Sequence, residues 1–216
     1  MGVEERRQRE REERKSRIID AAEQVFLTQG LAGATMADIA RSAELSKGTL
    51  YLYFESKDEL YLEIALRVLT EVESDYLQAV EIPGTGLERL ERFLHIHATQ
   101  ASEDPSRFQV ALSWLTAGYV VSGSATFEAY QSATSRLFLH GVAALQLGIE
   151  DKSVRSDLNP ATAAVQLWGG LAGVLLLSSN EKELGRRVPS AGSRGALVPG
   201  FIDILVAGIR SSKGKE

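Results

Sequence analysis

Apolar residues recur every three or four positions between residues 18 and 26, which predicts an amphipathic helix with one buried stripe. Gly30 follows at the place of a left-handed helix cap. A second helix is expected after Thr35, whose hydroxyl can accept the backbone N–H three residues on, with Asp38 at the reciprocal capping position. The predicted buried residues of these two helices are Ile18, Ala21, Ala22, Val25, Phe26, Ile39, Ala40 and Ala43.

A third, very short helix is predicted over residues 47–53, after a turn at 43–45 and a capping serine at position 46. Its exposed positions hold Lys, Gly, Thr and Tyr, and a helix face that meets only water would rarely use two tyrosines. A recognition helix enters a major groove about 12 Å wide with its N-terminal end near the base edges. Because a small residue there lets the backbone approach the bases, the pattern predicts a helix-turn-helix DNA-binding head.

The polar residues of this segment each have a chemical reason to contact DNA. Lys47 can reach a guanine edge or a phosphate, and Tyr51 is a stiff arm with a hydroxyl at its tip. A second capping box over residues 56–59 places Lys57 in the first helical turn, where free N–H groups favour an anion, so a phosphate clamp is expected. The predicted DNA contacts are Thr35, Ser46, Lys47, Gly48, Thr49, Tyr51, Tyr53 and Lys57.

Residues 18–61 resemble the DNA-binding head of the tetracycline-repressor (TetR) family of bacterial transcription regulators. One departure is Glu44, which stands in the turn where the family commonly has glycine, and it implies strain or a changed approach of the two helices. The rest of the chain resembles the family only in its helical layout. The resemblance is carried by Ala21-Ala22, Phe26, Gly30, Thr35, Ile39-Ala40, the run from Ser46 to Tyr51, Tyr53-Phe54, Lys57 and Leu60.

Charge and cysteine content restrict the function further. Residues 1–60 carry ten Lys or Arg against twelve Asp or Glu, so DNA binding must depend on a few placed cations. The net charge of −5 argues against non-specific binding to membranes or polyanions. The chain has no cysteine, which excludes disulfides and thiolate zinc sites and is compatible with a cytoplasmic location.

The first fifteen residues form a charged extension without an apolar core, so no signal peptide is expected. A frayed helical extension of the first helix is the favoured interpretation. An arginine arm that reaches a minor groove is the alternative, although five glutamates accompany the six cations between residues 4 and 15.

The segment 159–180 has no charged side chain and is long enough to span a bilayer. Against a membrane span, it contains several polar residues and glycines and lacks basic flanks. A helix that is apolar on nearly all sides is usually buried in a core or an interface. Gly169 and Gly173, four residues apart, would let another helix approach closely, so this helix is expected in a subunit interface.

The chain from residue 62 to 216 is predicted to be helical throughout, as a ligand-binding and dimerisation domain that follows the head at 16–61. By the TetR resemblance, the last two helices pair with their copies in a homodimer, through Gly169, Gly173, Phe201 and Leu205. The middle helices then enclose a cavity for a small apolar or amphipathic effector. Its expected lining is Phe93, His97, Phe108, Trp114, Tyr119, Phe127, Tyr130 and Trp168.

Signals for catalysis are poor, and no cofactor or metal site is expected. Gly84-Thr85-Gly86 is not a dinucleotide fingerprint, and His95 and His97 point to different helix faces while His140 stands alone. The sequence therefore predicts an all-α homodimeric repressor of about nine helices that binds double-stranded operator DNA and responds to a ligand. The alternative is an effector-free DNA-binding protein that acts through a protein partner or as an architectural factor; a helical enzyme that kept the head is a third.

Overall fold

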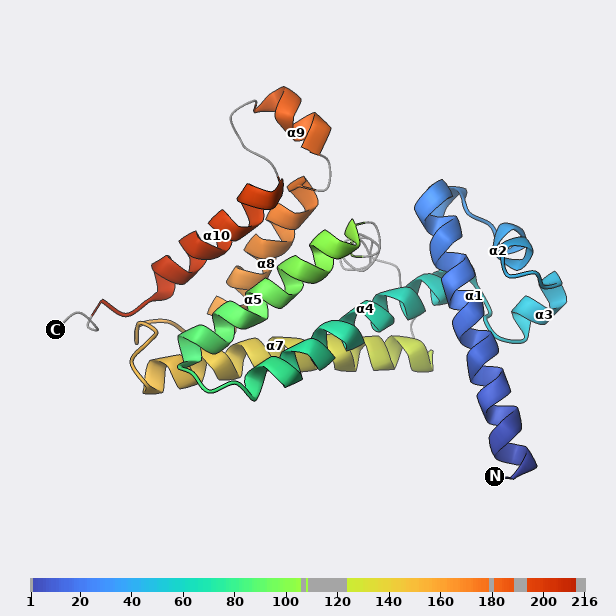
Figure 1. Ribbon diagram of the computed structural model, residues 1–216, viewed down its shortest axis with the longest axis horizontal. Helices are drawn as coiled ribbons and strands as arrows, with labels where there is room; N and C mark the ends of the chain where they lie inside the picture. Colours follow the sequence, from blue (N-terminus) through green and yellow to red (C-terminus); the bar gives the residue numbers. More distant parts are fainter. Residues whose placement is uncertain (1, 106–107, 109–123, 179–180, 189–193, 213–216) are drawn as a thin grey trace. The chain divides into compact units, whose positions relative to one another are not determined.

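The computed structural model describes residues 2–105, 108, 124–178, 181–188 and 194–212 (Figure 1). Within these residues the chain forms nine helices and no strand, apart from an isolated bridge between Val154 and Arg210. The all-α class is therefore confirmed. The chain divides into two compact units, residues 1–68 with 110–130 and residues 69–109 with 131–216, and each is described by itself.

The first unit contains α1 (Val3–Gly33), α2 (Met36–Ser42), α3 (Lys47–Tyr51) and the beginning of α4 (Lys57–Val80). Gly30 has a φ of 69° and a ψ of 165°, so it kinks the helix at the expected position, but α1 ends only at Gly33. Helix α1 already begins at Val3, and the charged extension is thus a continuous helical part of α1.

The core of the first unit lies where the apolar stripe of α1 meets α2, α3 and α4. Ile18 and Ala22 are fully buried, and the rings of Phe26 and Tyr61 pack edge to face with centroids 5.3 Å apart. Leu50 is the buried anchor of α3 and is also fully inaccessible. Because this side of α3 is fixed in the core, its other residues face outward.

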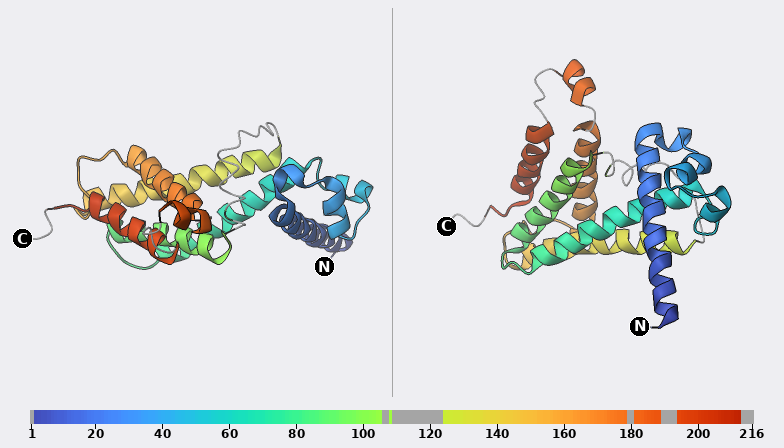
Figure 2. Two further views of the ribbon diagram at one scale, coloured as in Figure 1. Left: turned by 90° about the horizontal axis from the view of Figure 1, so that it is seen from above. Right: turned by 45° about the vertical axis from the view of Figure 1, so that its right-hand side comes forward.

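The second unit contains the remainder of α4, α5 (Gly86–Glu103), most of α7 (Ala125–Glu150), α8 (Pro160–Ser178), α9 (Glu181–Arg187) and α10 (Arg194–Ile209). Helices α8 and α10 lie side by side, and α5 contacts both (Figures 1 and 2). Asn159 caps α8 as expected, because its Oδ1 accepts the Thr162 N–H at 3.0 Å.

The start of α5 is held against the end of α7 by a close backbone approach. A Cβ at Gly86 would lie 2.0 Å from the Gly148 nitrogen, so this position requires glycine. Asp151 and Ser153 accept the Gly86 and Leu87 N–H groups at 2.7 and 3.1 Å. The free N–H groups at this helix N-terminus are satisfied by the loop after α7.

Several predicted element boundaries were wrong. Helix α3 ends at Tyr51, and residues 52–53 continue as a turn in which the Tyr53 N–H bonds to the Leu50 carbonyl at 3.0 Å. The expected loop after α8 contains the short helix α9, whose last turn carries Arg186 and Arg187 where the helix dipole favours cations. The helix expected after Ser102–Pro105 falls largely outside the described residues.

Candidate DNA-binding surface

Two hydroxyl caps define the start of α2 and of α3. Thr35 Oγ1 accepts the Asp38 N–H at 3.2 Å and donates to the Asp38 carboxylate at 2.5 Å, which lowers the pKa of that carboxyl. Ser46 Oγ accepts the Thr49 N–H at 3.1 Å and lies 2.8 Å from Thr49 Oγ1. These hydroxyls fix the two helices of the motif before any DNA is bound.

The exposed side of α3 presents Lys47, Gly48 and Tyr51, and the Tyr51 side chain is 51% exposed. A Cβ at Gly48 would meet only Ser46 Oγ, at 3.9 Å. The fold itself therefore does not need glycine at this position. The missing side chain leaves the backbone of α3 open toward its outer side, where a close approach to DNA is possible.

Tyr53 follows α3 in the turn and is half-buried. The guanidinium carbon of Arg11 lies 5.9 Å from the centroid of its ring, within cation–π range. The neighbouring Leu52 is 75% exposed. This contact brings the helical N-terminal extension next to the end of α3, and the sequence reasoning missed it although Arg11 is spaced seven residues before the buried Ile18.

The ammonium group of Lys57 already has two partners within the DNA-binding head. Its Nζ donates to the carbonyl of Leu31 at 2.8 Å and to that of Ala34 at 3.3 Å, and the residue is half-buried. Lys57 thus ties the start of α4 to the chain between α1 and α2. The ammonium group keeps one donor for an anion, so its phosphate contact stays a prediction.

Glu44 adopts a left-handed conformation with φ at 56° in the turn between α2 and α3. A side chain in this region costs about 1–2 kcal/mol relative to glycine. The strain expected from the sequence is therefore present. The turn keeps its geometry because the Leu45 N–H bonds to the Ala40 carbonyl at 2.8 Å.

Ion pairs fix α1 to α4 within the first unit. Lys15 Nζ lies 2.6 Å from Glu63 Oε1, and Arg67 Nη1 lies 2.5 Å from Asp20 Oδ1. Thr126 also donates to Glu63 Oε1, at 2.9 Å. These contacts hold α1 in a fixed orientation beside the start of α4.

Of the predicted ligand-lining residues, Phe93 and His97 lie together in the second unit, with ring centroids 4.6 Å apart. His97 is buried, its Nδ1 lies 3.0 Å from the Phe93 carbonyl oxygen, and burial lowers its pKa. Trp168 packs on Phe138 instead, at 5.4 Å. Phe108 is buried in the second unit, Phe127 and Tyr130 belong to the first, and Trp114 and Tyr119 lie outside the described residues.

The buried carboxylate of Glu73 pairs with the exposed Arg136 in the same unit. Arg136 donates to both oxygens of Glu73, at 2.7 and 2.8 Å, which lowers the pKa of that carboxyl. His140 Nε2 lies 3.4 Å from Glu73 Oε1, and its ring contacts that of Tyr76 at a tilt of 49°, with centroids 5.0 Å apart. The charge of Glu73 is thereby compensated, and in the described parts of the chain no three metal-ligating side chains come together.

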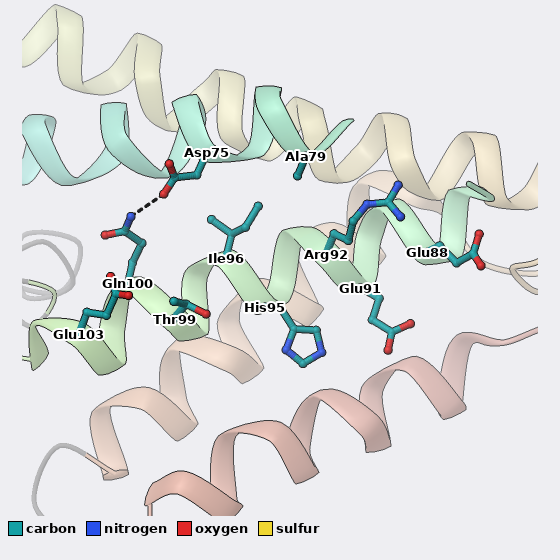
Figure 3. A pocket seen from close by; sticks show the side chains of 10 residues that line it. All are labelled: Asp75, Ala79, Glu88, Glu91, Arg92, His95, Ile96, Thr99, Gln100 and Glu103. Atoms are coloured by element: carbon teal, nitrogen blue, oxygen red, sulfur yellow. Dashed lines mark hydrogen bonds between the residues drawn. The ribbon is translucent and has the colours of Figure 1, made fainter. Parts of the chain in front are cut away.

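A surface groove of about 610 Å³ runs between α4 and α5 in the second unit (Figure 3). Asp75 and Ala79 of α4 line one side, and Ile96, Gln100 and Arg92 point toward them from α5. Gln100 donates to Asp75 at 2.6 Å. The predicted ligand-lining residues do not line this groove.

The predicted interface residues lie on α8 and α10. A Cβ at Gly169 or Gly173 would meet nothing within 4 Å, whereas one at Gly170 would lie 2.9 Å from the Phe201 ring. Gly170 is therefore the position at which α8 and α10 approach within the chain, and Phe201 belongs partly to that contact. By length and composition α8 could also cross a membrane. Of its most apolar 18-residue stretch, 39% is buried within the protein.

The capped pair α2 and α3, with a glycine on the exposed side of α3, defines a helix-turn-helix DNA-binding protein. Residues 18–64 match the family described as bacterial regulatory proteins, tetR family. This match confirms, for the DNA-binding head, the resemblance to the TetR family of transcriptional regulators found in the sequence.

Known relatives extend this similarity along the chain. The transcriptional regulator AcrR of Shigella flexneri is 24% identical over 170 residues, 77% of this chain and 78% of that protein. The fatty acid degradation regulator FadR of Bacillus halodurans has the same fold, with a TM-score of 0.68 and 21% identity over 92% of this chain and 97% of that one. FadR of Bacillus subtilis, solved in complex with stearoyl-CoA, has a TM-score of 0.67 and is 18% identical, over 90% of this chain and 99% of that one.

Proposed function

We propose that the protein is a repressor that binds a pseudo-palindromic operator as a homodimer and is released by an apolar or amphipathic effector. The main support for this proposal is the outer side of α3. Lys47 and Tyr51 are exposed there, and the fold does not require glycine at position 48. These residues, with Thr35, Ser46, Thr49, Tyr53 and Lys57 around them, are the proposed DNA contacts. The setting is the bacterial cytoplasm, where the operator is located.

The homodimer proposal rests on the outer side of α8 and α10. Val165 and Leu177 on α8 and Ile204 on α10 are 57, 64 and 69% exposed. Gly169 and Gly173 add open positions along the same helix. A second copy of this face would cover these apolar side chains and would use the glycines for a close helix crossing.

The proposed effector site lies around the aromatic cluster of the second unit. Tyr76 and Phe93 pack edge to face with centroids 4.7 Å apart, and His97 continues the cluster. Such a site suits an apolar group that meets few polar atoms. Acyl thioesters of coenzyme A are the first compounds to test, because the similar Bacillus subtilis FadR was solved with stearoyl-CoA.

The proposed release mechanism changes the separation of the two recognition helices. A symmetric dimer must place both copies of α3 in half-sites about 34–36 Å apart, or at a multiple of that distance. Helix α4 contributes to both units, because residues 57–68 belong to the first and 69–80 to the second. A ligand that tilts α4 would therefore move Lys57 and α3. The ligand can shift the equilibrium between the two separations of the recognition helices only by the difference in its affinity for them, typically about 1–3 kcal/mol.

The test begins with selection of bound duplexes from a random DNA pool by the full-length chain. A recovered two-fold related sequence supports the DNA-binding part, and recovery of no common sequence contradicts it. Stearoyl-CoA and shorter acyl thioesters are then titrated with and without the selected duplex. Linkage requires the duplex to weaken effector binding by the factor by which the effector weakens DNA binding. Equal effector affinities in both titrations would contradict release and favour the effector-free alternative.

A further inference from the structure

Three arginines of the helical N-terminal extension form a row beside the end of α3. Arg7, Arg11 and Arg14 are spaced four and three residues apart, so they share one face of α1. Together with Glu10, Leu52 and Tyr53 they line an open groove of about 470 Å³. The row continues the stripe that further along α1 is buried in the core, beginning at Ile18.

Three of the five carboxylates of the extension have partners outside the arginine row. Glu10, the acidic residue of the groove, lies 3.5 Å from Arg6 in an i,i+4 pair. Glu5 accepts the Gly2 N–H at 2.9 Å, and Glu12 accepts the Gln8 amide at 2.7 Å. These three carboxylates are thus bound to groups other than Arg7, Arg11 and Arg14, whose guanidinium groups share one face of the helix.

The groove begins where α3 ends. Leu52 and Tyr53 directly follow Tyr51, and Arg11 is fixed over the Tyr53 ring at 5.9 Å. A recognition helix of about 10 Å diameter nearly fills the major groove, so residues one turn beyond it lie within reach of the bordering phosphates. Figure 1 shows α1 continuing past α3 toward the N-terminus.

The length of the row suits the DNA backbone. Seven residues separate Arg7 from Arg14, which is about 10 Å of helix at 1.5 Å per residue. One DNA strand presents a phosphate about every 3.4 Å along the axis, so the row spans about three of them. Guanidinium groups also bind phosphate oxygens through paired donors.

We propose that Arg7, Arg11 and Arg14 form a second DNA contact, which binds the phosphates of the duplex flanking the half-site read by α3. This inference rests on the proposed function, because it requires α3 to bind an operator. The contact reads no bases. It adds affinity and salt dependence through ionic contacts to the flanking backbone.

The experiment uses the full-length chain and the duplex selected from the random pool, once with ten flanking base pairs on each side and once trimmed to the half-sites. The variants Arg7→Gln and Arg7→Gln/Arg11→Gln are compared with Arg9→Gln. Arg9 lies two residues from Arg7 on a different face of the same helix, and Gln has a helix propensity close to that of Arg. Circular dichroism checks that each variant remains folded.

For the flanked duplex, Arg7→Gln should reduce the slope of log K against log salt by about 0.9, and the double variant by about 1.8. The ratio of the wild-type binding constant to that of the double variant should then fall about twelvefold between 50 and 200 mM salt. Arg9→Gln should keep the wild-type slope, and the trimmed duplex should show no difference among the proteins.

Equal slopes for Arg7→Gln and Arg9→Gln would overturn this inference while leaving operator binding by α3 intact. A slope change that persists with the trimmed duplex would also overturn it, since the arginines would then contact the half-site itself. Failure to select any DNA sequence would overturn the proposed function together with the inference.

Discussion

Lys57 Nζ donates a hydrogen bond of 2.8 Å to the carbonyl of Leu31, twenty-six residues earlier in the chain. The same ammonium lies 3.3 Å from the Ala34 carbonyl. Carbonyls at the end of a helix carry a partial negative charge, so a cation is stabilised there. Lys57 therefore belongs to the framework of the DNA-binding head as well as to its predicted contact surface.

Lys57→Ala should lower the free energy of unfolding by about 1–2 kcal/mol, because two carbonyls lose a charged donor. It should also reduce the salt slope of operator binding by about one unit, if its remaining donor contacts a phosphate. Chemical denaturation and binding titrations at several salt concentrations measure the two effects separately.

Tyr51→Ala is the matched control, since Tyr51 is half-exposed and its removal leaves the core intact. It should weaken operator binding at unchanged stability. An unchanged salt slope in Lys57→Ala would mean that the lysine has only the structural role.

Gly48→Ala should stabilise the protein and weaken DNA binding at the same time. Alanine improves helix propensity by about 1 kcal/mol, and the new Cβ meets only Ser46 Oγ at 3.9 Å. The same methyl group would stand between the α3 backbone and the base edges. A melting curve and a binding isotherm measure both effects, and full operator affinity in this variant would place the DNA on another side of α3.

Glu44→Gly should raise the free energy of unfolding by about 0.5–1 kcal/mol. Glycine removes the cost of the left-handed conformation at φ 56°, and the greater freedom of the unfolded chain offsets part of that gain. Glu44→Ala is the control, because alanine keeps a Cβ and thus the strain. Equal stability of the two variants would show that the strain at this turn is negligible.

Gly173→Leu should give a folded monomer, because nothing within its own chain lies within 4 Å of the new Cβ. Gly170→Leu should instead destabilise the subunit itself, since the Phe201 ring lies 2.9 Å from the Cβ position. Sedimentation velocity and thermal unfolding distinguish the two outcomes. An intact dimer in Gly173→Leu would place the interface on another face.

Stability should fall as the pH drops below about 6.5, because burial lowers the pKa of His97 from that ordinary value. Below pH 6.5 the unfolded chain binds a proton that the folded chain excludes, so each pH unit costs up to about 1.4 kcal/mol until the folded pKa is reached. His97→Phe should flatten this dependence below pH 6.5. An unchanged slope in that variant would assign the effect to other groups.

The head could be predicted from the sequence because its signals are local. The caps at Thr35 and Ser46 involve residues three positions apart, and Gly30 kinks the helix through its own backbone conformation. The apolar stripe of α1 likewise needs only the helical period. Each of these features is fixed before distant parts of the chain meet.

The sequence could not predict contacts between distant residues. Nothing near Lys57 indicates that its ammonium reaches the Leu31 carbonyl, because that contact depends on how α1 packs against α4. Gly169, Gly170 and Gly173 look equivalent in the sequence, yet only Gly170 faces Phe201. The arginine row shares this limitation, since the charge balance of the extension conceals the face on which its cations gather.

The extension of α1 has a consequence for the thermodynamics of association. An arm that is disordered before binding loses about 1–2 kcal/mol of backbone conformational entropy per residue when it becomes ordered. From Val3 onward this arm is already helical and continuous with the buried stripe that starts at Ile18. Preorganisation of this kind leaves more of the interaction energy available for affinity.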